Sequence, residues 1–153
     1  MSCCSFDTNL LVYTVGPPAD PRRMRARDLI VRGMRNGNVI LLLQSLAEFA
    51  NVATRKLGID ADAVARRVLA WSNVIPVQPA GKEDLVVALQ ILRDHRLALW
   101  DALLCATAMR AGVEYLLTED LQDGRSLFGL AIVNPFISGN DALVDRILPP
   151  SRA

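Results

Sequence analysis

Short apolar runs alternate along the chain with longer segments in which apolar residues recur every three or four positions. The runs have the length of strands covered on both faces, and the longer segments have the period of helices with one buried side. Strands are expected at 2–6, 39–43, 74–77, 113–117 and 131–133. Helices are expected at 21–37, 45–57, 60–72, 81–95 and 102–111. This order predicts an α/β fold, a three-layer α/β/α sandwich with a central parallel sheet of about five strands.

Residues 1–153 are expected to form a single domain, because chains of this length seldom divide. Residues 136–153 are expected to be a C-terminal tail with one short helix. The segment 102–111 is apolar on nearly all sides, which is typical of a buried helix. The segment 81–95 is expected to bury one shared face: Leu85, Ala88, Leu89 and Leu92.

The composition narrows the class of protein. Hydrophobic residues make up 52% of the chain and charged residues 22%, which excludes a disordered protein. Three cysteines and one histidine exclude a fully paired disulfide framework and give no zinc-binding spacing. No apolar stretch reaches the roughly 20 residues of a membrane span, and the N-terminus lacks the pattern of a signal peptide. We therefore expect a cytoplasmic protein with no membrane partner.

Four acidic residues fall at equivalent places in this scheme. Asp7 ends the first strand, and Asp120 follows the fourth. Glu48 lies in the first turn of the helix after the second strand, and Asp101 opens the buried helix. The carboxyl ends of parallel strands and the amino ends of the helices that follow them share one edge of a sheet. The four carboxylates are therefore expected to converge there.

Convergence of carboxylates favours a bound cation. Carboxylates that crowd together repel one another, and some take up protons unless a positive charge lies among them. Ligands that are all oxygen, with no histidine or cysteine, favour Mg²⁺ or Mn²⁺. Such ions activate water for attack on a phosphodiester and stabilise the departing oxygen. The pattern thus indicates metal-assisted phosphoryl chemistry.

Each acid also has a purely structural interpretation. Asp7 could belong to a polar turn, Asp101 could be a helix N-cap, and Asp120 could be an ordinary loop acid. The string from Ser45 to Glu48 matches the capping box S-x-x-E. The apolar surroundings of Asp101 count against a simple cap, because a buried carboxylate without a partner is costly. The site is indicated by the set of four in order, and by none of them alone.

At these positions the chain resembles the PIN-domain nucleases. The resemblance covers about residues 2–136 and keeps the family's order and spacing. Four strings carry it: Phe6-Asp-Thr-Asn-Leu-Leu-Val-Tyr13, Ser45-Leu-Ala-Glu48, Trp100-Asp-Ala-Leu-Leu-Cys-Ala-Thr-Ala108 and Leu116-Leu-Thr-Glu-Asp120. The size of the chain is similar to that of VapC-type toxins of bacterial toxin–antitoxin pairs.

The resemblance implies a metal-dependent endoribonuclease that hydrolyses RNA. The implied ligands of Mg²⁺ or Mn²⁺, and catalytic residues, are Asp7, Glu48, Asp101 and Asp120. Asn9 and Thr118 would be supporting polar residues, and Ser45 would cap its helix close to the site. Glu119 and Asp123 are alternatives that could share the role of Asp120. The implied partners are a small antitoxin that masks the site and a second copy of the chain in a homodimer.

Two other functions are weighed. The first is a catalytically inactive PIN-like module that binds RNA or protein, although the complete set of four acids argues against it. The second is an unrelated α/β phosphotransfer enzyme with Asp7 as nucleophile. That enzyme would need a lysine over the phosphate, and neither Lys56 nor Lys82 lies at a predicted strand end.

Two further features could serve RNA binding. Six arginines lie between Arg22 and Arg35, where they could contact RNA phosphates or form a solvated helix face. Trp71 and Trp100 could stack on bases, but their apolar surroundings favour packing in the core.

Overall fold

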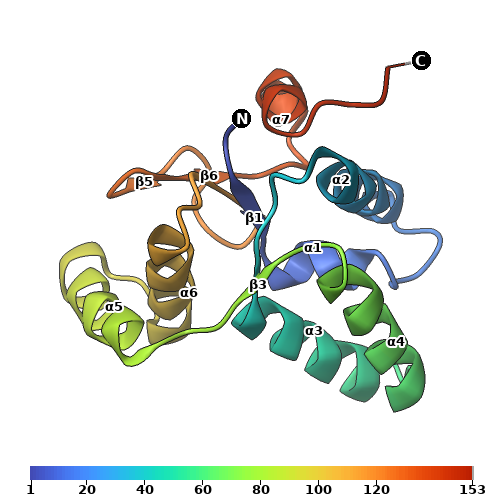
Figure 1. Ribbon diagram of the computed structural model, residues 1–153, viewed down its shortest axis with the longest axis horizontal. Coiled ribbons are helices and arrows are strands. Elements are labelled where there is room, and N and C mark those ends of the chain that lie inside the picture. Colours follow the sequence, from blue (N-terminus) through green and yellow to red (C-terminus); the bar gives the residue numbers. More distant parts are fainter. Residues whose placement is uncertain (153) are drawn as a thin grey trace.

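The computed structural model describes residues 1–152, so the last residue of the predicted C-terminal tail lies outside it. Figure 1 shows the arrangement of the helices and strands. The strands are β1 (Cys4–Phe6), β2 (Leu41–Leu42), β3 (Val77–Gln78), β4 (Tyr115–Leu117), β5 (Ser126–Leu127) and β6 (Leu130–Val133). The helices are α1 (Thr8–Tyr13), α2 (Arg22–Asn36), α3 (Leu43–Arg55), α4 (Ala61–Ser72), α5 (Lys82–His95), α6 (Leu99–Arg110), the short 3₁₀ helix η1 (Ser138–Asn140) and α7 (Asp141–Ile147).

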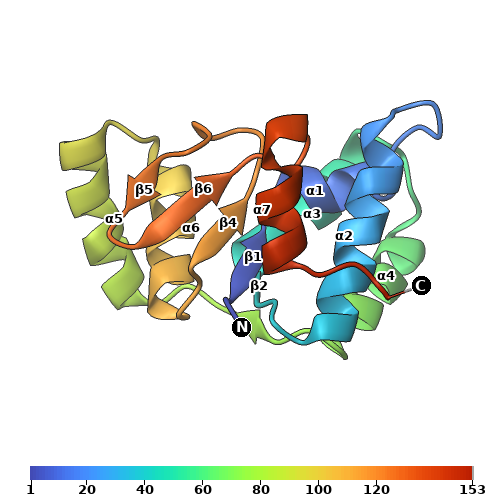
Figure 2. The same ribbon diagram turned by 90° about the horizontal axis from the view of Figure 1, so that it is seen from above.

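The strands form a mostly parallel sheet. Strands β1, β4 and β6 pair in parallel in that order, and β5 pairs antiparallel with β6 at the edge. Strands β2 and β3 pair in parallel, and a bridge between Cys4 and Val39 joins this pair to β1. Figure 2 shows β5, β6, β4 and β1 side by side. The predicted parallel sheet is confirmed, with an additional antiparallel edge strand.

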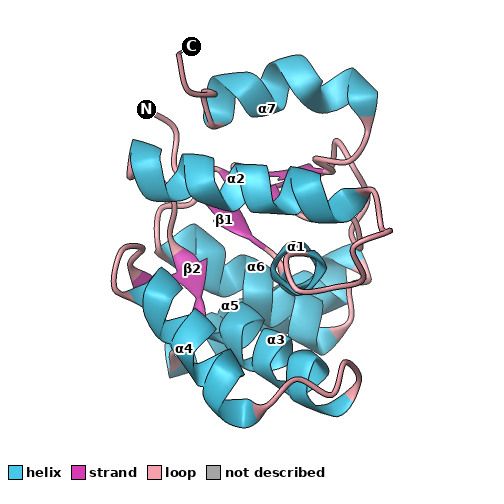
Figure 3. Cartoon of the chain, turned by 90° about the vertical axis from the view of Figure 1, so that its right-hand side faces the viewer, coloured by secondary structure: helices cyan, strands magenta, loops and turns pink. Residues whose placement is uncertain are grey.

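Helices cover both faces of this sheet, as the sandwich predicts. Figure 3 shows α2 and α7 on one side of β1, with α5 and α6 on the other. Successive residues of β4 point to opposite faces, so Leu117 joins the core under α2 and Leu116 joins the core under α6. Both leucines are fully buried. The edge at which these strands end is therefore flanked by packed layers on either side.

Helix α2 approaches the sheet closely at a glycine. A Cβ atom on Gly33 would lie 2.7 Å from Cγ2 of Val39 and 3.2 Å from the ring of Phe6. A larger residue here would push the helix off the sheet. Gly37, with φ of +68°, then ends the helix in the left-handed conformation that glycine adopts most easily.

Several boundaries differ from the predictions. Neither helix α1 nor the antiparallel strand β5 is among the predicted elements. The apolar run 39–43 leaves the sheet after Leu42, and its last residue already begins α3. The third strand is also shifted, to Val77–Gln78. The short C-terminal helix is confirmed as α7, preceded by η1.

Helices α5 and α6 contribute to the core that contains Leu116, and the sequence predicted their buried faces with different success. Helix α6 is buried along Ala102 and the run from Leu104 to Ala108, as predicted. Helix α5 instead buries Asp84, Ala88 and Ile91. The inner face predicted for it was wrong in part, since three of its four residues are exposed: Leu85, Leu89 and Leu92. Within residues 1–152 no helix has the length and apolar character needed to cross a membrane.

Candidate active site

Asp7 is fixed where β1 passes into α1. Its backbone N–H donates to the carbonyl of Leu117 at 3.0 Å, which continues the ladder between β1 and β4. Its carboxylate accepts a hydrogen bond from the backbone N–H of Thr8 at 2.7 Å, which caps the first turn of α1. The second carboxylate oxygen accepts from the Thr118 hydroxyl at 2.7 Å. Asp7 is only 6% exposed, so strand, helix and neighbouring strand all hold it in place.

The Thr118 hydroxyl is the centre of a small network. Thr118 directly follows β4 and is fully buried. While donating to Asp7, its oxygen accepts from the side-chain amide of Asn9 at 3.2 Å and from the backbone N–H of Asp120 at 3.1 Å. The Thr118 hydroxyl thus joins three other predicted site residues: Asp7, Asn9 and Asp120.

Glu48 reaches the same edge from α3. One of its carboxylate oxygens accepts from the Thr8 hydroxyl at 2.9 Å, and the other from the side-chain amide of Gln44 at 3.1 Å. The Gln44 amide also donates to the backbone carbonyl of Trp100 at 3.0 Å. The residue after that carbonyl is Asp101, so these bonds tie the starts of α1, α3 and α6 together.

The charges of Asp120 and Glu48 act on both Asp7 and Asp101. The pKa of Asp7 is raised to about 6, because burial and the charges of Asp120 and Glu48 outweigh the hydrogen bonds from Thr118 and Thr8, which lower it. Burial, followed by the charges of Asp120 and Glu48, also raises the pKa of Asp101. Asp7 and Asp120 are linked through Thr118, and the charges of Glu48 and Asp120 reach Asp101 as well, at the carboxyl edge of the sheet.

The donor set fits a hard divalent cation in its chemistry. All four side chains offer carboxylate oxygens, which Mg²⁺ and Mn²⁺ prefer. Among the described residues, however, no three acidic, histidine or cysteine side chains come close enough to form a ready-made metal site. Buried oxygens of Asn9, Gln44 and Ser45 also lack a hydrogen-bond partner within residues 1–152. Unpaired buried oxygens beside mutually repelling carboxylates are what a cation or its water ligands would satisfy.

Ser45 does not cap its helix, which corrects the prediction. Helix α3 begins at Leu43, with Leu42 as the N-cap residue and no side-chain cap. Ser45 is consequently the third residue of the helix, and its buried hydroxyl makes no hydrogen bond within residues 1–152. The capping box with Glu48 does not form, because the helix starts two residues before the predicted position. Asp101 is likewise no cap, since the N-cap residue of α6 is Ala98.

Among the acids that follow β4, Asp120 is the one whose charge raises the pKa of Asp7 and Asp101. Glu119 forms an ion pair with Arg22 at 3.1 Å. Asp123 accepts hydrogen bonds from the backbone of Asn134 and the side chain of Asn140, at 2.7 and 2.9 Å. Both alternatives are therefore committed to contacts that hold the loops, whereas Asp120 raises the pKa of Asp7 and of Asp101.

Several arginines of α2 are neither simply solvated nor free to bind RNA phosphates, because they pair with acids of the same chain. Arg22 pairs with Asp20 and Glu119 and lies 4.1 Å from the centre of the Tyr13 ring. Arg25 and Arg32 pair with acids of α7, Asp141 and Asp145, at 3.0 and 2.6 Å. Much of this positive charge therefore fastens α7 to α2.

The two tryptophans differ in their surroundings. Trp71 is buried against Phe49, with ring centres 4.9 Å apart, as predicted. Trp100 is 64% exposed, so the prediction that it packs in the core was wrong. It is the second residue of α6, and its side chain lies largely in solvent, whereas Leu104 and Thr107, one and two turns further along the same side, are buried.

Sequence reasoning missed two residues that organise the site, Thr8 and Gln44. Both are polar residues in the first turn of a helix that starts at a strand end, next to a predicted acid or three to four residues before one. That position is the signal by which they could have been found.

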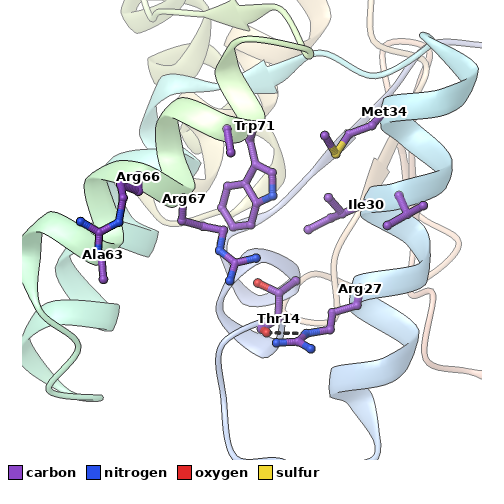
Figure 4. Close-up of a pocket in the computed structure, with 10 residues that line it drawn as sticks. Thr14, Arg27, Ile30, Met34, Ala63, Arg66, Arg67 and Trp71 are labelled. Carbon is purple, nitrogen blue, oxygen red and sulfur yellow. Dashed lines mark hydrogen bonds between the residues drawn. The ribbon is translucent and has the colours of Figure 1, made fainter.

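A groove of about 660 Å³ lies between α2 and α4, and none of the four acids lines it. Figure 4 shows Ile30 and Met34 on one wall and Trp71 on the other, with Arg66, Arg67 and Arg27 near its rim. Within residues 1–152 these three arginines form no ion pair with an acidic side chain.

Comparison with known proteins identifies the family. The PIN domain family model matches residues 5–122. VapC20 of Mycobacterium tuberculosis, described as a sarcin–ricin loop cleaving toxin, has 19% identity and a TM-score of 0.60 over 76% of this chain and 89% of its own. A toxin–antitoxin complex of Klebsiella pneumoniae has 20% identity and a TM-score of 0.62 over 87% and 98%. DNA-bound VapBC of Salmonella typhimurium has 17% identity and a TM-score of 0.61 over 86% and 97%.

No curated protein sequence matches the chain. At their level of identity the solved structures establish a shared fold. The family model spans well over half of the residues, including the positions of all four acids. The chain therefore belongs to the PIN domain family.

Proposed function

We propose that this protein is a metal-dependent endoribonuclease that hydrolyses RNA phosphodiester bonds, and that it is the toxin of a toxin–antitoxin pair. The observation that carries the proposal is the network in which Thr118 joins Asp7, Asn9 and Asp120. It joins the buried Asp7 carboxylate to Asp120, and the charges of Asp120 and Glu48 raise the pKa of Asp7. Membership of the PIN domain family and the toxins among its structural neighbours support the same function.

In this proposal Asp7, Glu48, Asp101 and Asp120 hold Mg²⁺ or Mn²⁺. An ion held by these residues would supply an activated water and would stabilise the departing oxygen of the phosphodiester. Thr118 keeps Asp7 in one orientation, and Asn9 and Thr8 keep their neighbours in place through the bonds described above. These bonds leave the Asp101 carboxylate without a hydrogen-bond partner among the described residues, so it is available to a ligand.

Titration of metal separates this function from an inactive binding module. Isothermal titration with Mn²⁺ is expected to show saturable binding to the wild type and binding at least about tenfold weaker to Asp101→Asn, which loses a ligand charge. Asp123→Asn is the matched control, since Asp123 holds a loop instead of facing the other acids. Equal Mn²⁺ binding by wild type and Asp101→Asn would contradict the site. No binding by either would favour the module.

The partner in this proposal is a small antitoxin, and the groove between α2 and α4 is a place for one of its helices. Apolar walls with three arginines at the rim suit an amphipathic helix with acidic residues along its sides. Arg66→Glu is expected to weaken capture of the protein encoded beside this one, measured by co-purification. Undiminished capture would place the antitoxin elsewhere.

The proposal also includes the cytoplasm as location and a homodimer as the assembled form. An apolar stripe of α5 supports self-association, since it is exposed over several turns: Leu85, Val86, Leu89 and Leu92. Light scattering on the purified protein is expected to give twice the chain mass of 16.7 kDa. A single-chain mass across concentrations would contradict the homodimer.

A further inference from the structure

We infer that Trp100 is a base-stacking residue that holds an unpaired base of the RNA next to the acidic site. The inference rests on the proposed function and adds to it the residue that recognises single-stranded substrate. Trp100 is the residue before Asp101 in α6, and consecutive Cα atoms are about 3.8 Å apart. Successive helix residues point about 100° apart, so the indole ring projects to one side of the Asp101 carboxylate, where a base of an RNA strand at the acidic edge can reach it.

Trp100 is far more exposed to solvent than the other tryptophan of the chain, Trp71. Its side chain is 64% exposed, whereas Trp71 is 4% exposed and lies against an aromatic ring. None of the aromatic pairs within residues 1–152 includes Trp100. A large aromatic side chain left in solvent beside a site is a surface on which a partner can stack.

The backbone of Trp100 is nevertheless held firmly. Its carbonyl accepts the hydrogen bond from Gln44, whose amide also binds Glu48. The same contact thus fixes the position of one carboxylate and of the residue that presents the indole ring. Leu43, the neighbour of Gln44, is 49% exposed and adds apolar surface at the start of α3.

Charge gives a reason for recognition by stacking. Four carboxylates repel RNA phosphates until a cation is bound, and the arginines of α2 at 22, 25 and 32 are paired with acids of the same chain. Stacking on the face of a base is independent of that repulsion and requires no hydrogen-bond pattern. It does require that the base be unpaired, so a base within a duplex should not bind to Trp100.

Binding is tested in EDTA, where the proposed cleavage cannot occur. Tryptophan emission is titrated with a short single-stranded oligoadenylate, with the same strand lacking its bases, and with a duplex of equal length. We expect quenching by the oligoadenylate alone, and loss of that quenching in Trp100→Phe, which leaves only the buried Trp71 to emit. Equal quenching in wild type and Trp100→Phe would overturn the inference.

Affinity is measured by anisotropy of the labelled oligoadenylate. Trp100→Ala is expected to bind about 5- to 150-fold more weakly, the range for loss of one stacked base, while Trp100→Phe stays close to wild type. Phe128→Ala is the matched control, because Phe128 is 68% exposed but lies in the turn before β6, at the opposite edge of the sheet from the acids. Thermal melts confirm that each variant is folded.

The remaining outcomes separate the inference from the proposed function. Quenching without any metal-dependent cleavage would leave the base contact standing and refute the nuclease. EDTA-sensitive cleavage together with unchanged binding by Trp100→Ala would support the nuclease and refute the base contact. If Trp100→Ala instead turns a dimer into a single chain by light scattering, Trp100 belongs to a subunit interface and the inference is overturned.

Discussion

At the scale of single residues, the site depends on how Asp7 is buried. A carboxylate that is 6% exposed among three others would be strongly destabilised in its charged form without the bonds from Thr118 and Thr8. Those bonds lower its pKa but do not offset burial, and the pKa stays raised at about 6. Residues that surround Asp7 therefore have measurable effects on stability as well as on the proposed chemistry.

Asp7→Asn is expected to change how stability depends on pH in EDTA. The pKa of Asp7 is raised from 3.8 in the unfolded chain to about 6 in the fold. Its contribution is therefore fully present below about pH 4 and is lost as the pH rises through about 6. From pH 4 to 7.5 the free energy of unfolding of the variant should gain up to about 3 kcal/mol on that of the wild type. Urea unfolding measures this gap, and a gap that stays constant with pH would contradict the burial argument.

Thr118→Val is expected to weaken both the fold and the reaction. The variant loses a fully buried hydroxyl that serves three neighbours, and it leaves an oxygen of Asp7 unpaired. We expect a loss of about 1–3 kcal/mol in stability and a loss of at least about tenfold in RNA cleavage. Thr118→Ser keeps the hydroxyl and should restore most of both. A fully active Thr118→Val would show that the network does not position Asp7.

At the scale of elements, the starts of helices decide which residues meet. The chain leaves β2 for α3 without a side-chain cap, and this early start places Gln44 and Glu48 where they bind Trp100 and Thr8. Helix α4 starts differently, with the Asp60 carboxylate accepting from two backbone N–H groups. Removing a polar side chain at the start of the helix should therefore change stability little in α3 and more in α4.

Ser45→Ala is expected to cost less than about 0.5 kcal/mol, because the hydroxyl makes no bond within residues 1–152. Asp60→Ala is expected to cost about 1 kcal/mol through loss of a real N-cap. Both free energies come from urea unfolding under the same conditions. A loss of 1 kcal/mol or more in Ser45→Ala would revive the capping role predicted from the sequence.

The sequence predicted which acids follow the ends of strands better than it predicted the boundaries of the elements themselves. Acids that follow strands are recognisable because strand ends are marked by the end of an apolar run, so Asp7 and Asp120 could be placed without coordinates. Helix α1 could not be predicted, since Leu10-Leu-Val12 is an apolar run too short to show a helical period. The inner face of α5 was misjudged because apolar residues surround that helix, and periodicity then selects no single side.

Exposure was the property least accessible from the sequence. Trp100 stands in an apolar string that also contains the buried part of α6, and only the assembled structure shows that its side chain lies in solvent. The fate of the arginines of α2 was equally hidden. Their partners on α7 are more than one hundred residues away in the chain.

At the scale of the whole molecule, those arginines join the C-terminal helix to the sandwich. Arg32, whose side chain is 11% exposed, binds Asp28, Asp145 and the carbonyl of Leu148. Arg32→Met is therefore expected to lower the free energy of unfolding by about 1.5–3 kcal/mol. Arg35→Met is the matched control, since Arg35 is exposed and has no ion pair within residues 1–152, and it should change stability little. Equal effects of the two variants would argue that the charges of α2 do not fasten α7.

The four acids belong to separate elements, so their arrangement depends on the whole molecule. Asp7 and Asp120 come from the ends of β1 and β4, and Glu48 and Asp101 come from two further helices, α3 and α6. Nothing but the assembled fold brings them to one edge, and no one of them is sufficient for the proposed reaction. Loss of any one carboxylate should therefore abolish cleavage while the fold persists.

Cleavage of total cellular RNA tests the central claim most directly. The purified protein is incubated with Mg²⁺ or Mn²⁺, with EDTA, and beside Asp101→Asn and the control Asp123→Asn, with folding verified by circular dichroism. We predict discrete products with either metal, none in EDTA, none with Asp101→Asn, and wild-type products with Asp123→Asn. Products that persist in EDTA or in folded Asp101→Asn would contradict the account.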